Sequence, residues 1–333
     1  MIRVGKEEIR ICIINVYFGT FPNYFPLWLK SAEKNPNIDF LIFSDGTYAN
    51  LPTNVRIVRS SLADIKQRAE KALGFEVALD TPYKCCDYKA IYGLLFKDEL
   101  QGYDYWGHCD LDLIWGDLEK CFIKNDITRY DRFFFLGHLS LYRNNDTVNN
   151  YIKLPGAAVD YREVYTTNRI CVFDEVPGTV QIYLKHGLPM FSEKKFADIS
   201  SIYRRFCLAK LTVNGEKIQN YHRQVFIWKN GCVYRLYSRR HRIFEEEYAY
   251  IHFKKRPNFE LNFNWQSCSS FAITDAGFFP VDGLSPNEII ARYARCRSVI
   301  VEELEYLRYL ALPYLDAIKR RTTRLLENEK GNV

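Results

Sequence analysis

Two carboxylates at the end of an apolar segment are the strongest chemical signal in the sequence. Residues 103–109 form an aromatic and apolar run that predicts a short buried strand, and Asp110 and Asp112 follow it directly. Side chains two positions apart in an extended segment point to the same side, so both carboxylates can face one point in space. Oxygen ligands of this kind suit Mg²⁺ or Mn²⁺ held together with substrate phosphates. The pattern therefore predicts a divalent-metal site, although an isolated Asp-x-Asp is common by chance and is most often a pair of solvated turn carboxylates.

A histidine and two lysines late in the sequence can complete such a site. His252 lies in the apolar segment 248–253, which predicts a strand, and Lys254 and Lys255 come directly after it. An imidazole can complete a Mn²⁺ shell that carboxylates begin, and ammonium groups can hold the diphosphate that the metal bridges. We therefore expect His252 to be a third metal ligand and the two lysines to contact phosphate. A strand histidine bonded to backbone groups is the alternative for His252.

Further charged and aromatic residues are candidates for nucleotide contacts. Lys84, Asp87 and Lys89 stand at the start of a helical pattern that precedes the Asp-x-Asp segment. The lysines can face phosphate, and the aspartate can either accept hydrogen bonds from a sugar or cap the helix. Tyr17 and Asp45 follow the first and second apolar runs, so we expect them to hold a nucleotide base by stacking and hydrogen bonding.

Alternating strands and helices must position these residues. Strands are predicted at residues 9–17, 39–45, 55–58 and 103–109, and helices at residues 24–34, 62–73 and 86–100. This alternation is typical of a parallel sheet with right-handed crossovers. No G-x-G-x-x-G follows the first strand and no G-x-x-x-x-G-K-[ST] occurs, which argues against Rossmann dinucleotide-binding and P-loop proteins.

The second half of the sequence is looser and ends in a helical segment. It predicts a strand at 133–136, substrate-facing loops within 144–196 and a hairpin at 225–237 that turns at Asn230-Gly231. Ser285, Pro286 and Glu288 predict the start of a long helix that is interrupted at Pro313. Beyond it, apolar residues alternate with a basic cluster: Lys319, Arg320, Arg321 and Arg324. We expect one catalytic domain at 1–284 and a helical extension at 285–333 whose basic amphipathic tail either packs on the domain or docks on a membrane.

The composition excludes several classes of protein. Hydrophobic residues make up 47% of the chain and aromatic residues 16%, which indicates a globular core rather than disorder. A net charge of +6 is too mild to indicate nucleic-acid binding, but it favours anionic substrates or an acidic membrane face. No apolar run is long enough to span a membrane, and residues 1–8 lack the apolar core of a signal peptide. Ten scattered cysteines without zinc-like spacing predict reduced thiols, so we expect a cytoplasmic protein, either free or peripheral on the inner face of the membrane.

Taken together, these motifs resemble GT-A glycosyltransferases. The features that carry the resemblance are the N-terminal strand–helix–strand unit, Asp87 upstream of Asp110-Leu111-Asp112, and the late His252-x-Lys254. The chain also resembles an uncharacterised bacterial family of glycosyltransferase-like proteins found with surface-polysaccharide genes. The resemblance covers residues 9–260 and implies a GT-A-like, Rossmann-related α/β fold. Its central sheet would be mixed, mainly parallel and flanked by helices, with a C-terminal helical extension.

The resemblance also implies a reaction and a set of ligands. It implies transfer of a hexosyl group from a UDP- or GDP-linked sugar to a saccharide or lipid-linked acceptor in surface polysaccharide biosynthesis. It implies Mn²⁺ or Mg²⁺ bound by Asp110, Asp112 and His252, with nucleotide-sugar contacts from Tyr17, Asp45, Lys84, Asp87, Asp110, Lys254 and Lys255. Leu113 departs from many such enzymes, in which polar and glycine-rich residues follow the motif, and this leaves the donor sugar and the anomeric outcome open.

An inverting enzyme would also need a base for the acceptor hydroxyl. Asp174 and Glu175 follow the apolar run 170–173 and precede Pro177-Gly178, so they are our first candidates for a catalytic role. The alternative for these residues is an ordinary pair of turn carboxylates.

Two other functions compete with this interpretation. Asp110 and Asp112 also resemble the nucleophile motif of haloacid-dehalogenase-type phosphatases, in which the first aspartate attacks phosphorus. That motif continues with Gly-Thr and lies near the start of its domain, whereas Leu113 and Ile114 stand here and three strands precede them. The other possibility is a non-catalytic carbohydrate-binding protein, whose 24 Tyr and 23 Phe could include sugar-stacking rings.

Overall fold

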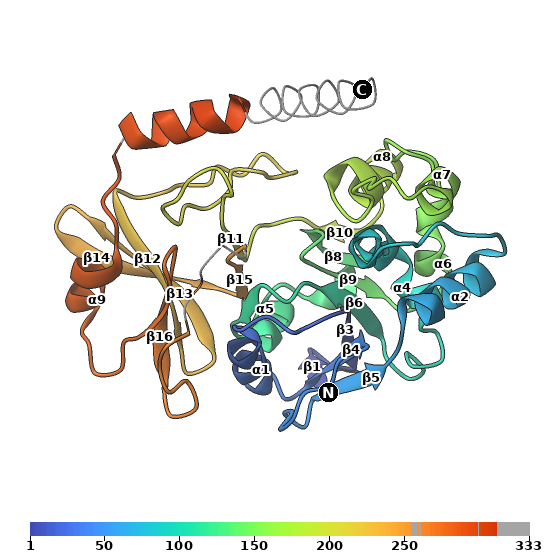
Figure 1. The fold of residues 1–333 in the computed structure, drawn as a ribbon, viewed down its shortest axis with the longest axis horizontal. Helices are drawn as coiled ribbons and strands as arrows, with labels where there is room; N and C mark the ends of the chain where they lie inside the picture. The colour runs from blue at the N-terminus through green and yellow to red at the C-terminus, as the bar shows by residue number, and fades with distance from the viewer. Residues whose placement is uncertain (255–258, 260, 299, 312–333) are drawn as a thin grey trace, which may run out of the picture.

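A seven-stranded sheet forms the centre of the molecule (Figure 1). The computed structural model describes residues 1–254, 259, 261–298 and 300–311. The strand order is β10-β8-β9-β6-β3-β4-β5. The strands are β3 (Ile11–Val16), β4 (Ile38–Ser44), β5 (Val55–Arg59), β6 (Tyr105–Cys109), β8 (Arg132–Leu136), β9 (Leu139–Arg143) and β10 (Met190–Phe191). Only β9 runs antiparallel to its neighbours, so the mixed, mainly parallel sheet expected from the sequence is confirmed.

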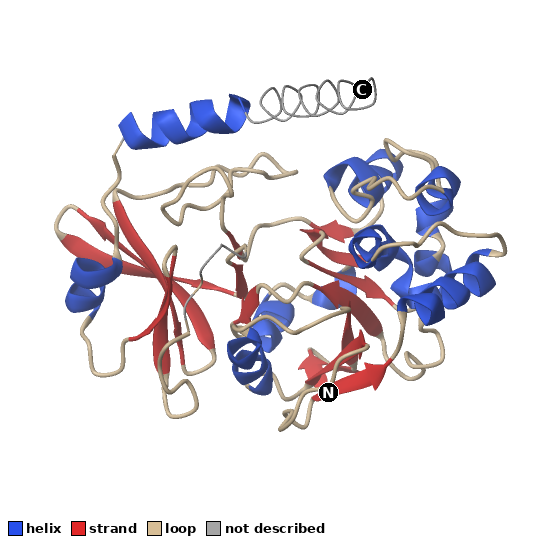
Figure 2. Cartoon of the chain, viewed as in Figure 1, coloured by secondary structure: helices blue, strands red, loops and turns tan. Residues whose placement is uncertain are grey.

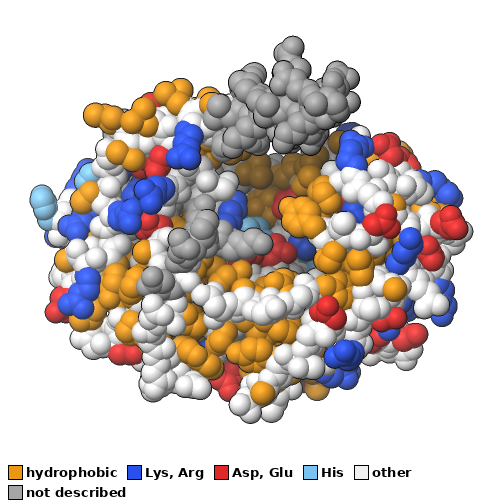
Figure 3. All heavy atoms as spheres, in the orientation of Figure 1, with side chains coloured by type: hydrophobic (Ala, Val, Ile, Leu, Met, Phe, Trp, Pro, Cys, Tyr) orange, Lys and Arg blue, Asp and Glu red, His pale blue; other side chains and the backbone are white. Residues whose placement is uncertain are grey.

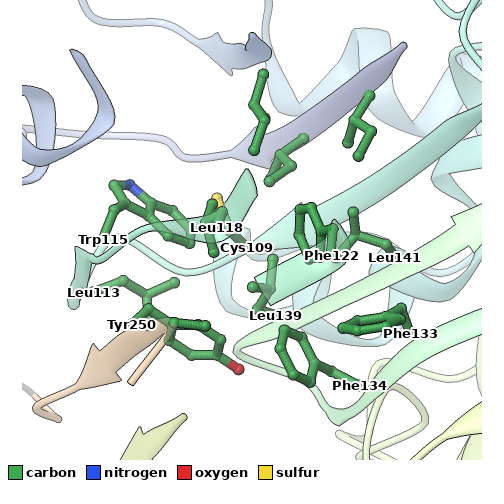
Figure 4. Close-up of a cluster of buried hydrophobic side chains, with 14 of the residues drawn as sticks. Cys109, Leu113, Trp115, Leu118, Phe122, Phe133, Phe134, Leu139, Leu141 and Tyr250 are labelled. Atoms are coloured by element: carbon green, nitrogen blue, oxygen red, sulfur yellow. The ribbon is translucent and has the colours of Figure 1, made fainter. Parts of the chain in front are cut away.

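Both faces of this sheet are buried, which explains the continuous apolar runs in its strands. Ile11 and Ile13 of β3 belong to one hydrophobic cluster, whereas Cys12 and Ile14 belong to the cluster on the opposite face. The first cluster gathers Trp115, Phe122, Phe133, Phe134 and Tyr250 with their neighbours (Figure 4). Helices cover the sheet (Figure 2) and are α1 (Phe25–Glu33), α2 (Leu62–Leu73), α4 (Tyr92–Leu95), α5 (Leu118–Lys124), α6 (Asp146–Asn149), α7 (Tyr161–Thr166) and α8 (Gln181–His186).

Residues 85–95 form several short turns, not the continuous helix that we predicted at 86–100. α3 (Cys85–Tyr88) is followed by a 3₁₀ turn (Lys89–Ile91) and then by α4. Gly93 packs against Trp106 so closely that a Cβ there would lie 2.4 Å from the indole nitrogen. Asp87 does not cap this segment, because the residue at the N-cap of α3 is Lys84 and no side chain caps the helix. Packing against the next strand therefore shapes this segment more than helical periodicity does.

A three-stranded sheet, β11-β15-β7, joins the centre of the molecule to its second half. β7 (Leu113–Trp115) starts directly after Asp112, and β15 (Tyr250–His252) pairs with it antiparallel, with His252 opposite Leu113. β11 (Ala197–Asp198) pairs with β15 in parallel and brings Asp198 beside His252. This register is what gathers residues 110, 112, 198 and 252 into one place.

A five-stranded antiparallel sheet in the second half was not expected from the sequence beyond its central hairpin. Its order is β14-β13-β12-β16-β17. The strands are β12 (Arg223–Lys229), β13 (Cys232–Arg239), β14 (Arg242–Tyr248), β16 (Ser270–Thr274) and β17 (Gly277–Pro280). The predicted hairpin is confirmed, since β12 and β13 are joined at Asn230-Gly231, both with positive φ. Val225 and Ile227 face α9 (Pro286–Tyr293), whereas Phe226 and Trp228 face the rest of the molecule.

The C-terminal segment begins as predicted but is not one long helix. Ser285 and Glu288 form the expected capping box at the start of α9. That helix ends at Tyr293, and residues 300–311 form a separate helix. Pro313 and the basic tail lie outside the described residues. No helix in the described part of the chain has the length and hydropathy to span a bilayer.

Two smaller features complete the fold. β1 (Ile2–Val4) and β2 (Glu7–Ile9) form an N-terminal hairpin that packs against α5. All ten cysteines lie in the described part of the chain, and each is a free thiol. This agrees with the reduced thiols expected from their spacing.

Candidate functional site

The Asp-x-Asp segment lies at the carboxyl end of β6, near the centre of the main sheet. Asp110 donates its backbone N–H to the carbonyl of His138 at 3.0 Å, which ties the strand end to the β8–β9 turn. The Trp28 indole donates to the Asp110 carbonyl at 3.3 Å. Phe253 donates its N–H to the Asp112 carbonyl at 3.2 Å. The backbone of this segment is therefore held from three sides, as a preorganised ligand site requires.

The two carboxylates and His252 meet as the sequence predicted. One donor atom from each of Asp110, Asp112 and His252 lies within 4.8 Å of the other two. The Nε2 atom of His252 is 3.4 Å from Oδ2 of Asp112, and its Nδ1 atom is 3.0 Å from Oδ1 of Asp198. Burial would lower the pKa of His252, but the charges of Asp112 and Asp198 outweigh it and raise the pKa to about 10.

This donor set fits a divalent cation. Two carboxylates and one imidazole suit Mn²⁺ and, through the oxygens, Mg²⁺. One ring nitrogen of His252 is held by Asp198 while the other faces Asp112, which is the usual arrangement of a metal-binding histidine and its supporting carboxylate. The three side chains that we predicted as metal ligands are thus close enough together to hold one ion.

Asp198 is a member of the site that sequence reasoning missed. Its side chain is buried and also lies 3.5 Å from Lys254 Nζ, 3.9 Å from Lys194 Nζ and 3.9 Å from His138 Nε2. Burial would raise the pKa of Asp198, but the bond from His252 and the charges of neighbouring groups, Lys254 among them, lower it, so the carboxylate is ionised. A single aspartate in a two-residue strand leaves no pattern by which the sequence could reveal this position.

Lys89, which we expected to face phosphate, lies against the carboxylates of the site. Its Nζ atom lies 2.6 Å from Oδ1 of Asp110, 3.3 Å from Oδ2 of Asp174 and 2.9 Å from the carbonyl of Gly137. Burial would lower the pKa of Lys89, but Asp110 and Asp174 raise it well above the usual value. The ammonium group is therefore charged, and it links the metal-ligand candidates to the predicted catalytic pair.

Asp174 and Glu175 lie together against Gly137. A Cβ at Gly137 would be 2.3 Å from Oδ2 of Asp174 and 2.9 Å from Oε1 of Glu175, so the close approach of both carboxylates requires glycine there. Burial, and then the charge of Asp174, raise the pKa of Glu175 to about 7. A carboxylate with such a pKa is suited to accept a proton near neutral pH.

Lys84 and Asp87 lie in the interior, not at the site surface. Both side chains are fully buried, and they pair with each other at 2.8 Å. Lys84 also donates to the carbonyls of Val164 and Arg169, while Asp87 accepts the N–H groups of Cys171 and Phe173. This network anchors the loop that ends in Asp174 and Glu175, so the pair supports the site without facing a nucleotide.

We predict that Asp87→Asn destabilises the fold by about 3–5 kcal/mol, because it leaves the buried charge of Lys84 without its partner. Urea unfolding followed by circular dichroism measures this loss. Asp146→Asn is the matched control, since its pair with Lys97 is largely exposed and such pairs contribute less than about 1 kcal/mol. Equal midpoints for the two variants would contradict the anchoring role.

A cleft of about 920 Å³ opens beside the carboxylates. Its lining includes Tyr17, Tyr24, Tyr83, Lys89, Asp110 and Asp112. Figure 3 shows acidic side chains at the bottom of a hollow in the middle of one face. The volume and the aromatic walls suit a ligand with a flat ring and anionic groups.

The remaining residues that we predicted to contact the nucleotide sugar differ in where the structure places them. Tyr17 lines the cleft and donates its hydroxyl to the Thr20 carbonyl. Asp45 is exposed at the end of β4 and accepts the Gly19 N–H at 2.9 Å, which fixes the loop that follows Tyr17. Lys254 lies beside Asp198. Lys255 lies outside the described residues.

Comparisons with known proteins give one family and a number of distant likenesses to solved structures, two of which follow. A protein-family model described as "Family of unknown function (DUF6625)" matches residues 13–282. No curated protein matches the chain. Mouse xyloside xylosyltransferase 1, in its apo form, is similar with a TM-score of 0.37 and 7% identity over 59% of this chain and 90% of that one.

The second solved structure is the galactosyltransferase LgtC in complex with donor and acceptor sugar analogs. It is similar with a TM-score of 0.34 and 12% identity over 58% of this chain and 77% of that one. At these identities and TM-scores neither likeness carries the functional argument, which depends on the chain's own residues.

Proposed function

The chain belongs to this family of unknown function, DUF6625, and from its own site we propose that it is a metal-dependent glycosyltransferase of the GT-A type. It would transfer a hexosyl group from a UDP- or GDP-linked sugar to a saccharide or lipid-linked acceptor, in surface polysaccharide biosynthesis. The observation that carries the proposal is the meeting of Asp110, Asp112 and His252 at the carboxyl end of β6, beside a cleft of about 920 Å³.

The donor diphosphate is the group that this site is suited to hold. Asp110, Asp112 and His252 would bind Mn²⁺ or Mg²⁺, and the bound ion would neutralise the charge that develops on the leaving nucleoside diphosphate. Lys89 and Lys254 place ammonium groups at the same carboxylate cluster, where they favour the binding of an anion. The net charge of +6 acts in the same direction over a longer range.

The walls of the cleft suit the rest of the donor. Tyr17, Tyr24 and Tyr83 line it, and a tyrosine ring can stack on a nucleotide base or pack against a sugar. Tyr83 is 75% exposed, so its ring can reach a ligand without displacing other side chains. Asp45 holds the loop after Tyr17, and we propose that it positions this wall.

Glu175 is our candidate for the base of an inverting reaction. With a pKa raised to about 7, it can take the proton of the acceptor hydroxyl as that oxygen attacks the anomeric carbon. Asp174 is buried against Lys89 and contributes charge that keeps the pKa of Glu175 high. We therefore assign proton transfer to Glu175 and a positioning role to Asp174.

The decisive test is thermal stability in the presence of nucleotides and nucleotide sugars, with and without Mn²⁺. A ligand that binds only the native state adds RT ln(1 + [L]/Kd), about 2.7 kcal/mol at a hundredfold excess over Kd. We expect a shift that needs both the metal and a UDP or GDP species. A shift with phosphate mimics and Mg²⁺, and none with any nucleotide, would instead identify a phosphatase.

We predict that Asp198→Asn weakens Mn²⁺ binding by about 10- to 100-fold, the usual cost of losing the carboxylate behind a metal-binding histidine. Calorimetric titration with Mn²⁺ measures this affinity directly. Glu193→Gln, an exposed change in the same segment, is the control and should leave the affinity unchanged. If Asp198→Asn bound Mn²⁺ as the native protein does, His252 would not be a ligand held by Asp198.

A further inference from the structure

Exposed hydrophobic side chains are concentrated on the helix at residues 300–311. Fourteen large hydrophobic residues are exposed in the described part of the chain, and half of them lie on this one helix. They are Ile300, Val301, Leu304, Tyr306, Leu307, Tyr309 and Leu310. Such a density on one element marks a surface that contacts something apolar.

Three of these residues form a row along one side of the helix. Ile300, Leu304 and Leu307 are spaced by four and three residues, so they lie one above the other on the same face. Their exposed fractions are 75%, 61% and 54%. Figure 2 shows the helix lying along the outer edge of the molecule. We call Ile300, Leu304 and Leu307 the apolar row.

The opposite side of the helix is fixed to the protein by ion pairs. Glu302 pairs with Arg205 at 2.9 Å and with Arg297 at 2.8 Å. Glu305 accepts the backbone N–H of Arg204 at 3.2 Å. On a helical wheel Glu302 and Glu305 lie away from the apolar row, so these contacts hold the row facing outward.

The basic cluster that follows the helix in the sequence favours an anionic partner. On the helix itself Glu303 and Arg308 are both exposed and balance each other in charge, while Glu302 and Glu305 contact arginines. The sequence continues with the basic cluster Lys319, Arg320, Arg321 and Arg324. An outward apolar row followed by Lys and Arg is the pattern of helices that lie in the surface of a bilayer containing anionic lipids.

We propose that the helix at 300–311 docks this protein on an anionic phospholipid bilayer through Ile300, Leu304 and Leu307. This docking surface is independent of the reaction proposed for the site. It lies close to the site along the chain, because Arg204 and Arg205, which hold the helix, follow Asp198 in the same segment.

Flotation with lipid vesicles tests the proposal on the full chain. We expect the native protein to bind vesicles of phosphatidylcholine with phosphatidylglycerol more strongly than vesicles of phosphatidylcholine alone, and to be released by high salt. The double variant Leu304→Glu/Leu307→Glu should reduce the bound fraction by about tenfold or more. Leu184→Glu, which changes another exposed leucine, on α8, should bind as the native protein does.

Three results would overturn the proposal. The first is no binding of the native protein to vesicles that contain phosphatidylglycerol, and the second is equal binding by the double variant. The third is a native dimer that becomes monomeric in the double variant without any vesicle binding, which would assign the row to a second copy of the chain. Leu304 and Leu307 are more than half exposed, and unchanged circular dichroism and melting would show that the variants are folded. Donor binding by the double variant measures the proposed function separately.

Discussion

Replacing Asp112 by asparagine is expected to reduce metal-dependent turnover of a nucleotide sugar by about 10²–10³-fold. The amide keeps the shape of the side chain but removes the charge that would attract the cation. Asp112 is also the carboxylate nearest Nε2 of His252, so its loss affects two of the three proposed ligands. Product release from candidate UDP and GDP sugars, with Mn²⁺ varied, measures the effect.

The control for this experiment must separate the loss of a metal-binding side chain from the loss of the folded structure. Asp98→Asn changes an exposed aspartate that lies before β6 and should leave turnover unchanged. Circular dichroism should show a native fold for both variants. Calorimetry should show weaker Mn²⁺ binding for Asp112→Asn alone. Full turnover by Asp112→Asn, with normal metal dependence, would remove this site from the proposal.

The sequence predicted the elements whose signal is local. β3 and β4 were found because strands buried on both faces are apolar throughout, and β5 was found from the short run 55–58. The helix predicted at 62–73 is α2, and Ser61 and Asp64 form its capping box. The hairpin of β12 and β13 was found from Asn230-Gly231. In these cases the residues adjacent in the sequence determine the backbone conformation.

Elements shaped by distant contacts were missed. β14 carries Glu245, Glu246 and Glu247 in succession, which does not resemble a strand, yet it pairs with β13 from Val233 to Arg239. The segment 85–95 breaks because Gly93 must pack against Trp106. Tertiary contacts override local propensity at both places.

The residues of the site also divide into those that the sequence predicted and those that it missed. Asp110, Asp112 and His252 could be predicted because each follows or ends an apolar strand. Lys84 and Asp87 were predicted from their place at the start of a helical pattern, but they pair with each other in the interior. Lys89 was predicted to face phosphate and pairs with Asp110 and Asp174, whereas Asp198 joins the site through the β11–β15 register. Long-range pairing of this kind leaves no local pattern in one sequence.

Replacing Glu175 by glutamine is expected to lower kcat by about 10²–10⁴-fold if Glu175 accepts the acceptor proton. Glutamine has the same shape but cannot take a proton. Turnover by the native protein should rise with pH and level off above about 7, because the carboxylate must be ionised to act. The rising limb should disappear in the variant, and Glu163→Gln, an exposed change on α7, should keep it.

Glu175 should also affect stability, with a sign that follows from its raised pKa. Its folded-state pKa of about 7 lies above the ordinary value of 4.5, so its contribution is complete below pH 4.5 and is lost as pH rises through about 7. Asp174, Lys89 and Asp110 are the charges that act on it. Glu175→Gln should therefore be more stable than the native protein at pH 8, by on the order of 2 kcal/mol, with no such gain at pH 4.

The kinetic and the stability measurements on Glu175→Gln can give different answers, so together they test the assignment of Glu175 as the base. A variant that gains stability at pH 8 but keeps its kcat would show a buried carboxylate with no role in proton transfer, as a retaining reaction would allow. A variant that loses kcat without any change in stability would contradict the burial that raises the pKa of Glu175. Loss of kcat and of the rising pH limb, together with the gain at pH 8, is the outcome that the position of Glu175 against Gly137 and Asp174 predicts.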